Sequence, residues 1–289
     1  MQRIGWALPV ARAKAGVHVT APTTKLNLWN AVMTTRHWIR FTHAGKSGFG
    51  TLEGDTVRAF TGDMFDAPAP SGELLPRAAV TLRRPVEPGK AIAMFNNFRA
   101  LLDKLQQRVP AEPLYFLKPS NSYLDPHGVI AKPQACDSRV IFEGELGVVI
   151  GRRCRNVSED DAPAHVFGYT CVNDVTATDL LTRDTSFVQW TRAKGFDGFC
   201  PIGPAIATGL DPGTLVVRTL LNGSVRQDYP VADMVFAVPQ LVSRLSWNMT
   251  LDPGDLILCG TSVGVGVMKP GSTIEVEIDG IGRLTNRFE

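Results

Sequence analysis

Two strand–turn–strand patterns in the C-terminal third constrain the fold of this chain more than any other feature. Asn222-Gly223 stands between the apolar runs Val216–Leu221 and Val225–Tyr229, and Asp279-Gly280 follows the alternating run Thr273–Ile278. Such dipeptides favour tight turns between antiparallel strands, because Asn, Asp and Gly tolerate positive φ angles. The 289 residues also include 27 glycines and 20 prolines, which add further chain reversals. We therefore predict a β-rich α+β fold with few helices.

Shorter patterns predict the other elements. Alternating runs over 37–42 and 48–52, with a turn at 53–55, indicate small antiparallel strands near the N-terminus. Apolar residues at helical spacing predict helices over 99–108 and 238–247. The remaining expectations are apolar strands over 140–151, 169–175 and 256–260, a capping box formed by Ser158 and Asp161, and a surface connector over 67–72.

The domain organisation is predicted from changes in composition. Residues 1–32 lack acidic side chains, and we expect them to be a disordered extension or to follow an upstream start codon. The Pro- and Gly-containing segment 84–89 is the best domain boundary. We therefore expect a small N-terminal β-domain over 33–85 and a larger domain over 86–289, which contains the candidate site described below.

Charge and cysteine content restrict the partners and the location. Residues 1–52 hold seven Lys and Arg and no Asp or Glu, which leaves 23 against 28 over 53–289, a net charge of −5. An acidic body argues against nucleic acid as a partner. No run of 18 apolar residues occurs, so we expect no membrane role. Five widely spaced cysteines without a C-x-x-C motif indicate buried, reduced thiols in a cytoplasmic protein.

Three carboxylates are the candidate metal ligands. Glu143 and Glu145 lie two residues apart in an apolar strand and therefore project from one face. Two carboxylates about 4 Å apart repel by about 4 kcal/mol at an effective dielectric of 20. Burial would therefore protonate one of them unless a cation lies between them. Asp174 ends the apolar run 169–175. Three carboxylates with open positions suit octahedral Mg²⁺ or Mn²⁺.

Two further segments carry candidate site residues. Lys194 has apolar and aromatic neighbours in 190–199, and a desolvated ammonium stabilises an enolate or a carbonyl oxygen. The loop containing Gly260, Thr261 and Ser262 follows an apolar run and is suited to cradle a substrate carboxylate. Spacing leaves alternatives open: a solvated glutamate pair, a surface lysine and a plain tight turn. The five histidines do not converge on one segment, and Ser262 lacks the G-x-S-x-G pattern of a serine hydrolase.

Taken together, these segments resemble the fumarylacetoacetate hydrolase family over nearly all of Met33–Glu289. The segments that carry the resemblance, in chain order, are EGELGVVIG at 143–151, GYTCVNDV at 168–175, AKGFD at 193–197, MTLDPGD at 249–255 and GTSVGVG at 260–266. The resemblance implies Glu143, Glu145 and Asp174 as ligands of Mg²⁺ or Mn²⁺ and Lys194 as an active-site cation. It implies that Thr261, with Gly260 and Ser262, contacts a small oxo-acid substrate. It also implies a homodimer, a mixed β-roll catalytic domain and a small N-terminal β-domain.

The chain departs from the family pattern at two positions whose side chains often activate water in other members. Family members often carry a His and a Glu on a mobile lid, where this chain has Leu101 and Lys104. We therefore expect a metal-dependent isomerase or decarboxylase, similar to those of homoprotocatechuate breakdown, acting on 2-oxo or 2-hydroxydienoic (di)carboxylic acids through a metal-stabilised enolate. One alternative is a C–C bond hydrolase of acylpyruvate or fumarylacetoacetate type, in which Asp103 substitutes as the base. Another is a non-catalytic ligand-binding homologue.

Overall fold

Short strands dominate the computed structural model, which describes residues 35–134 and 136–289. The predicted β-rich α+β class is confirmed. Met33–Glu289 form one compact unit. The extension predicted over 1–32 lies outside the described residues. None of the helices in the described part of the chain is long and apolar enough to cross a membrane.

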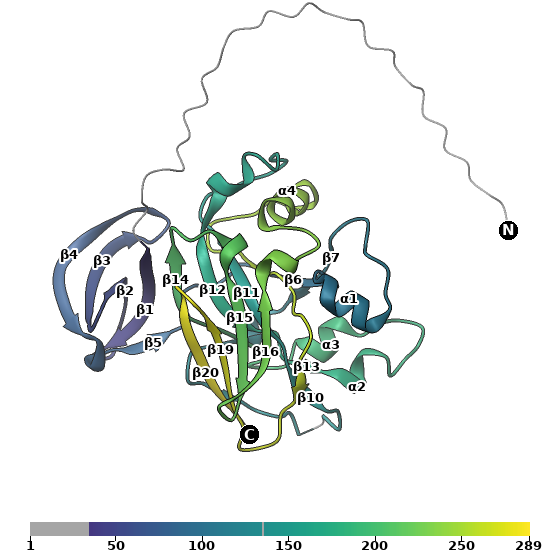
Figure 1. Cartoon of the computed structure of the whole chain (residues 1–289). Helices are drawn as coiled ribbons and strands as arrows, with labels where there is room; N and C mark the ends of the chain where they lie inside the picture. Colours follow the sequence, from purple (N-terminus) through teal and green to yellow (C-terminus); the bar gives the residue numbers. More distant parts are fainter. Residues whose placement is uncertain (1–34, 135) are drawn as a thin grey trace, which may run out of the picture. The chain divides into compact units, whose positions relative to one another are not determined.

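The N-terminal strands form a meander at one end of the large sheet (Figure 1). Their bounds are β1 Arg36–His43, β2 Lys46–Glu53, β3 Thr56–Asp63, β4 Asp66–Pro76 and β5 Thr81–Arg83. The segment 67–72, predicted to be a surface connector, belongs instead to β4, so that prediction is wrong. Proline is tolerated there because β4 is the edge strand, where a missing N–H breaks no ladder on the open side.

The large mixed sheet continues from β1 in the order β1-β14-β12-β11-β17-β6-β7, with β8 beside β14. Most neighbours are antiparallel, while β6 and β17 run parallel. The strands are β6 Ala91–Phe95, β7 Leu114–Lys118, β8 Tyr123–Leu124, β11 Gly144–Ile150, β12 Val166–Asn173, β14 Cys200–Thr208 and β17 Leu256–Leu258. The apolar strands predicted over 169–175 and 256–260 correspond to β12 and β17.

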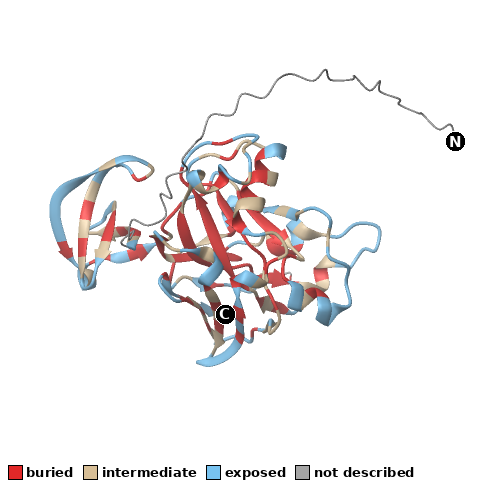
Figure 2. Ribbon diagram, turned by 45° about the horizontal axis from the view of Figure 1, so that its top comes forward, coloured by how far each residue is buried: buried red, intermediate tan, exposed pale blue. Residues whose placement is uncertain are grey.

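Strand β11 is central, and all of its residues are buried (Figure 2). Leu146 and Val148 face a core shared with α4, whereas Val149 faces a second core that includes Trp38. Because side chains alternate along a strand, Glu145 lies on the face of Val149. The sheet thus carries an ionisable side chain between two apolar layers.

The strand predicted over 140–151 is broken at Glu143, which corrects that prediction. Strand β10 (Val140–Phe142) pairs with β13 and β18 in a separate three-stranded sheet, and β11 begins at Gly144. Side chains replace the ladder at the break: the Glu143 N–H donates to Asn173 Oδ1 at 3.0 Å, and the Gly144 N–H donates to Gln227 Oε1 at 3.0 Å. Such partners are visible only in the folded chain.

Both predicted hairpins are confirmed in a five-stranded sheet of order β16-β15-β19-β20-β9. Asn222 and Gly223 have φ angles of 52° and 77°, as the tight turn between β15 and β16 requires. The strands of the two smaller sheets that remain to be defined are β9 Val129–Ile130, β13 Thr176–Ala177, β15 Val216–Leu221, β16 Ser224–Pro230, β18 Gly266–Val267, β19 Thr273–Ile278 and β20 Gly282–Phe288.

The helices are short and include both predicted ones. They are α1 Arg99–Leu105, α2 Thr178–Leu181, α3 Trp190–Lys194 and α4 Val238–Asn248, with 3₁₀ turns at Arg77–Ala79, Ser120–Ser122, Ala162–His165, Pro212–Thr214 and Val231–Asp233. Helix α4 buries Leu241, Val242 and Leu245 against the main core. Ser158 and Asp161 do bond each other, but they precede a single 3₁₀ turn rather than an α-helix.

Candidate metal centre

Three acidic side chains meet where β10 ends and β12 ends. Glu143 lies at the strand break, Glu145 in β11, and Asp174 directly after β12. One carboxylate oxygen from each lies within 4.8 Å of the others. The Asp174 N–H donates to the Glu143 carbonyl at 2.8 Å, so the backbone itself joins the two segments. Glu145 and Asp174 are 1% exposed, and Glu143 is partly buried.

Two lysine ammonium groups complete the cluster. Lys194, the last residue of α3, places Nζ 2.6 Å from Asp174 Oδ2 and 2.9 Å from Glu143 Oε2. Its Nζ also lies 5.3 Å from the centre of the Phe116 ring. Lys118, at the end of β7, places Nζ 2.5 Å from Asp174 Oδ1, and its side chain is fully buried. Asp174 therefore receives both ammonium groups, one on each oxygen.

The burial and charge of the cluster perturb its acid–base chemistry. Burial raises the pKa of Glu145 well above its ordinary value, and the charges of Asp174 and Glu143 raise it further. Burial acts in the same sense on Asp174, but Lys118 and Lys194 outweigh it and hold the pKa of Asp174 below its ordinary value. The three carboxylates raise the pKa of Lys194 despite its burial. Lys194 thus stays charged, and Glu145 is the carboxyl group of the cluster that most readily keeps a proton.

The donor set fits a hard divalent cation. Carboxylate oxygens are the ligands that Mg²⁺ and Mn²⁺ prefer. Two ammonium groups offset only two of the three carboxylates, so the ionised cluster keeps one uncompensated negative charge. A buried, uncompensated charge is costly unless a further cation is bound. That Glu143, Glu145 and Asp174 hold a metal stays a prediction, and the geometry is compatible with it.

The glycine loop lies against the same cluster. The Gly260 N–H donates to Glu145 Oε2 at 2.7 Å. The Thr261 hydroxyl donates to the Gly144 carbonyl at 3.0 Å and accepts from Gln227 Nε2 at 2.8 Å. Ser262 is fully buried, and its hydroxyl has no hydrogen-bond partner within the described residues. The substrate-binding role predicted for this loop remains a prediction.

Asp103 is not brought into the cluster by any hydrogen bond or ion pair of the described residues. It is exposed on α1, whereas Leu101 of the same helix packs against the main core. The histidines that the structure describes also stay apart from the carboxylates. Three of them, His37, His43 and His165, bond backbone carbonyls elsewhere.

Sequence reasoning missed three residues around the cluster: Lys118, Gln227 and Tyr229. Lys118 ends an aromatic and apolar strand, the same kind of setting that singled out Lys194, and this signal was sufficient to find it. Gln227 and Tyr229 alternate on one face of β16 and are both buried. Nothing in the local pattern marks them, because β16 and β11 belong to different sheets and are separated in the chain by β12, β13, β14 and β15.

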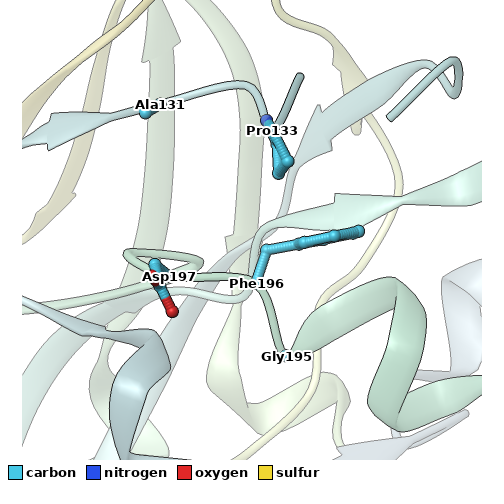
Figure 3. Close-up of a pocket in the computed structure, with 5 residues that line it drawn as sticks. All are labelled: Ala131, Pro133, Gly195, Phe196 and Asp197. Atoms are coloured by element: carbon cyan, nitrogen blue, oxygen red, sulfur yellow. The ribbon is translucent and has the colours of Figure 1, made fainter. Parts of the chain in front are cut away.

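A shallow pocket of about 350 Å³ is lined in part by the three residues that follow Lys194 in the chain (Figure 3). It is lined by Ala131, Pro133, Gly195, Phe196 and Asp197. The Asp197 carboxylate accepts a hydrogen bond from Asn121 Nδ2 at 2.6 Å. The carboxylates of the cluster do not line this pocket, so it is a neighbouring surface feature rather than the candidate centre.

Comparison with known proteins now identifies the family. The family model "Fumarylacetoacetate (FAA) hydrolase C-terminal" matches residues 90–289, and an N-terminal model, "Rv2993c-like, N-terminal", matches residues 36–85. The first match covers more than half of the chain. This protein therefore belongs to the fumarylacetoacetate hydrolase family, whose members are enzymes, and the resemblance seen in the sequence is confirmed.

Proteins similar to this chain include isomerases and a hydrolase. The structure of a 2-hydroxyhepta-2,4-diene-1,7-dioate isomerase from Mycobacterium marinum is 38% identical, with a TM-score of 0.80 over 88% of this chain and 98% of that one. A 4-hydroxyphenylacetate degradation bifunctional isomerase/decarboxylase from Salmonella dublin is 39% identical over 69% of this chain and 47% of its own length. The structure of a maleylpyruvate hydrolase from a Sphingobium species is 29% identical, with a TM-score of 0.73 over 87% of this chain and 98% of that one.

Proposed function

We propose that this protein is a divalent-metal-dependent isomerase or decarboxylase of 2-oxo or 2-hydroxydienoic (di)carboxylic acids from the breakdown of aromatic compounds. One observation carries the proposal: three clustered carboxylates, two of them buried and one partly buried, are joined to two lysines, while α1 has Leu101 and Lys104 instead of a water-activating pair. The isomerase from Mycobacterium marinum and the isomerase/decarboxylase from Salmonella dublin support the same class.

The residues of the cluster divide the work between them. Glu143, Glu145 and Asp174 would hold Mg²⁺ or Mn²⁺, and the bound ion would supply Lewis-acid polarisation of a substrate oxygen. The ammonium of Lys194 is fixed by Glu143 and Asp174, so it is positioned to stabilise negative charge that develops on the substrate. The buried Lys118 ammonium forms its ion pair with Asp174.

Hydrolysis is the second candidate, because the Sphingobium relative is a hydrolase. Cleavage of a C–C bond by water needs a positioned base in addition to charge stabilisation. Asp103 is the candidate base on α1, and its exposure means that the helix would have to close over a substrate. A non-catalytic homologue is the third candidate, and the retained carboxylates and lysines favour it least.

A substrate panel tests the proposal. Oxaloacetate decarboxylation, ketonisation of a 2-hydroxydienoic diacid and acylpyruvate hydrolysis are compared with Mg²⁺, with Mn²⁺ and with a chelator. We expect the first two reactions to be faster than the third and all to need metal. Faster hydrolysis, lost in Asp103→Asn, would overturn the isomerase or decarboxylase assignment. No turnover of any substrate in the panel would favour the ligand-binding homologue.

Ligand substitutions test the metal assignment separately. We expect Glu143→Ala, Glu145→Ala and Asp174→Ala each to abolish metal-dependent turnover while the protein still folds, because each removes a ligand of the cation. Asp197→Ala is a matched control, since Asp197 is a nearby carboxylate outside the cluster. Full metal-dependent activity in two of the three ligand variants would contradict the assignment.

Assembly and location are also proposals. We propose a cytoplasmic homodimer that binds small oxo-acids and neither nucleic acid nor membranes. All five cysteines are buried and free of disulfides, which supports a reducing compartment. Light scattering coupled to size-exclusion chromatography measures the oligomeric state, and a monomer across the micromolar range would contradict the dimer.

A further inference from the structure

The backbone of Gly144, between the two glutamates of the candidate centre, is held by three side chains, through the two peptide groups that join it to Glu143 and Glu145. Its N–H donates to Gln227 Oε1 at 3.0 Å. Its carbonyl accepts from the Tyr229 hydroxyl at 2.5 Å and from the Thr261 hydroxyl at 3.0 Å. We call Gln227, Tyr229 and Thr261 the peptide clamp.

Two members of the clamp, Gln227 and Tyr229, are buried, and Thr261 is partly buried. Gln227 is 1% exposed and Tyr229 is 3% exposed. The Gln227 amide also donates to Thr261 Oγ1 at 2.8 Å and to the Ser262 carbonyl at 3.2 Å. The hydrogen of the Thr261 hydroxyl is therefore already donated to Gly144, and its oxygen already accepts from Gln227.

The close packing around Gly144 leaves its backbone little freedom to move. A Cβ atom at this position would lie 2.0 Å from Thr219 Oγ1, far inside any ordinary contact distance. A backbone pressed against β15 and bonded on both sides has one orientation. Any rotation of the two peptide groups that flank Gly144 would tilt Glu143 and Glu145 relative to each other, because these two groups link their backbones.

The loop that contains Thr261 also bonds one of the candidate ligand carboxylates. Gly260, which precedes Thr261, donates its N–H to Glu145 Oε2 at 2.7 Å. Thr261 thus ties the loop to the strand break, and Gly260 ties it to one of the candidate ligands. The strand break and the loop are consequently fixed relative to each other by β16.

We infer that Gln227 and Tyr229 are positioning residues that hold the Glu143 and Glu145 carboxylates at their metal-binding separation, and that the Thr261 hydroxyl belongs to this clamp and is not a free donor to substrate. The inference rests on the proposed metal centre. It assigns a role to two residues whose side chains bond the Gly144 backbone and the loop at 261–262, and none of the candidate ligand carboxylates of the described residues.

Mn²⁺ binding to the full chain tests the inference, with free Mn²⁺ measured by electron paramagnetic resonance. Tyr229→Phe removes one hydrogen bond from the Gly144 carbonyl without changing the ring. We expect the Kd for Mn²⁺ to rise about fivefold, since one buried hydrogen bond contributes about 1 kcal/mol. Tyr169→Phe is the matched control, because Tyr169 is buried in the same core and makes no side-chain hydrogen bond to the described residues of the cluster. Its Kd should equal that of the unmodified protein.

Thr261 variants separate the clamp from direct substrate contact. Thr261→Val should raise the Kd for Mn²⁺, and Thr261→Ser, which keeps the hydroxyl, should restore it. If Thr261→Val leaves the Mn²⁺ affinity unchanged and raises only the KM for substrate, the hydroxyl contacts substrate and the inference is overturned. These variants also decide the matter if Tyr229→Phe does not fold.

The remaining outcomes are also decisive. An unchanged Mn²⁺ affinity in Tyr229→Phe, or an equal loss in Tyr169→Phe, overturns the positioning role while leaving the metal centre intact. Absence of Mn²⁺ binding by the unmodified protein overturns the metal centre itself and the clamp with it.

Discussion

At the scale of single residues, Asp174 is the point on which the charges of the site converge. Its two oxygens accept from different lysines, Lys118 on Oδ1 and Lys194 on Oδ2. Only Lys194 also reaches a second carboxylate, Glu143. The two lysines are therefore not equivalent: one is shared by the cluster, and the other serves Asp174 alone.

Removal of Lys118 should be costly for the fold as well as for the site. In Lys118→Met, Asp174 loses one of its two buried partners, and breaking a buried ion pair from one side typically costs about 3–5 kcal/mol. We expect a loss of that order in the free energy of unfolding, measured by denaturant titration in the presence of chelator. Arg139→Met removes a partner from the exposed Arg139–Asp179 pair and should change stability little. A Lys118→Met protein as stable as the control would contradict the buried pairing.

Because the pKa of Glu145 is raised, we expect the stability of the protein to depend on pH. Since the folded protein holds this proton more tightly than the unfolded chain, the native state binds more protons above the ordinary carboxyl pKa, and stability without metal falls as pH rises. A bound cation displaces the proton, so the stabilisation by Mn²⁺ should grow as pH rises from about 5 to about 8. Melting temperatures with and without Mn²⁺ measure this. The trend should weaken in Glu145→Gln, and a stabilisation that shrinks with pH would refute the prediction.

At the scale of elements, α1 ends in a residue whose conformation does not suit it. Gln106 caps the helix in the left-handed region, with φ 53° and ψ 38°, where glycine is favoured. We expect Gln106→Gly to increase the free energy of unfolding by about 0.5–1 kcal/mol, because it relieves left-handed strain at an exposed position. Lys104→Gly, within the right-handed part of α1, is the control and should destabilise by about 1 kcal/mol. Equal effects of the two changes would contradict the explanation.

At the scale of the whole molecule, the N-terminal strands are continuous with the large sheet. Arg36, His37 and Trp38 of β1 pair with β14, and Trp38 is buried among Phe49, Phe60 and Phe167. The two family models thus meet in one sheet, although they match separate ranges of the chain.

A fragment of residues 86–289 should therefore be less stable than the chain from which it is cut. Without β1, strand β14 exposes an unpaired edge, and Ile206 loses part of its apolar cover. Exposed edges favour association. We expect a lower melting temperature and increased light scattering, compared with the full chain at equal concentration. A monodisperse fragment with an unchanged melting temperature would show that the N-terminal strands are dispensable for the larger part.

Local chemistry made much of this protein predictable. The Asn222-Gly223 and Asp279-Gly280 turns, helix α4 and the apolar strands were predicted because turn geometry and side-chain periodicity depend on residues close together in the chain. Glu143 and Glu145 were singled out for the same kind of reason, their spacing of two residues, although the strand that this spacing presumed is broken at Glu143. Asp174 and Lys194 were candidates from their surroundings, and their role came from the family resemblance.

Only the tertiary structure decided how these parts meet. Strand β4 contains Pro68 and Pro70 because it lies at a sheet edge, and the break at Glu143 exists because Asn173 and Gln227 replace the ladder bonds there. Lys118 is tolerated in the interior because it is paired with Asp174, which is 56 positions away in the chain. Local sequence determines the conformations that a segment can adopt, whereas burial, charge pairing and edge position depend on neighbours that are distant in the chain, and these complete the site.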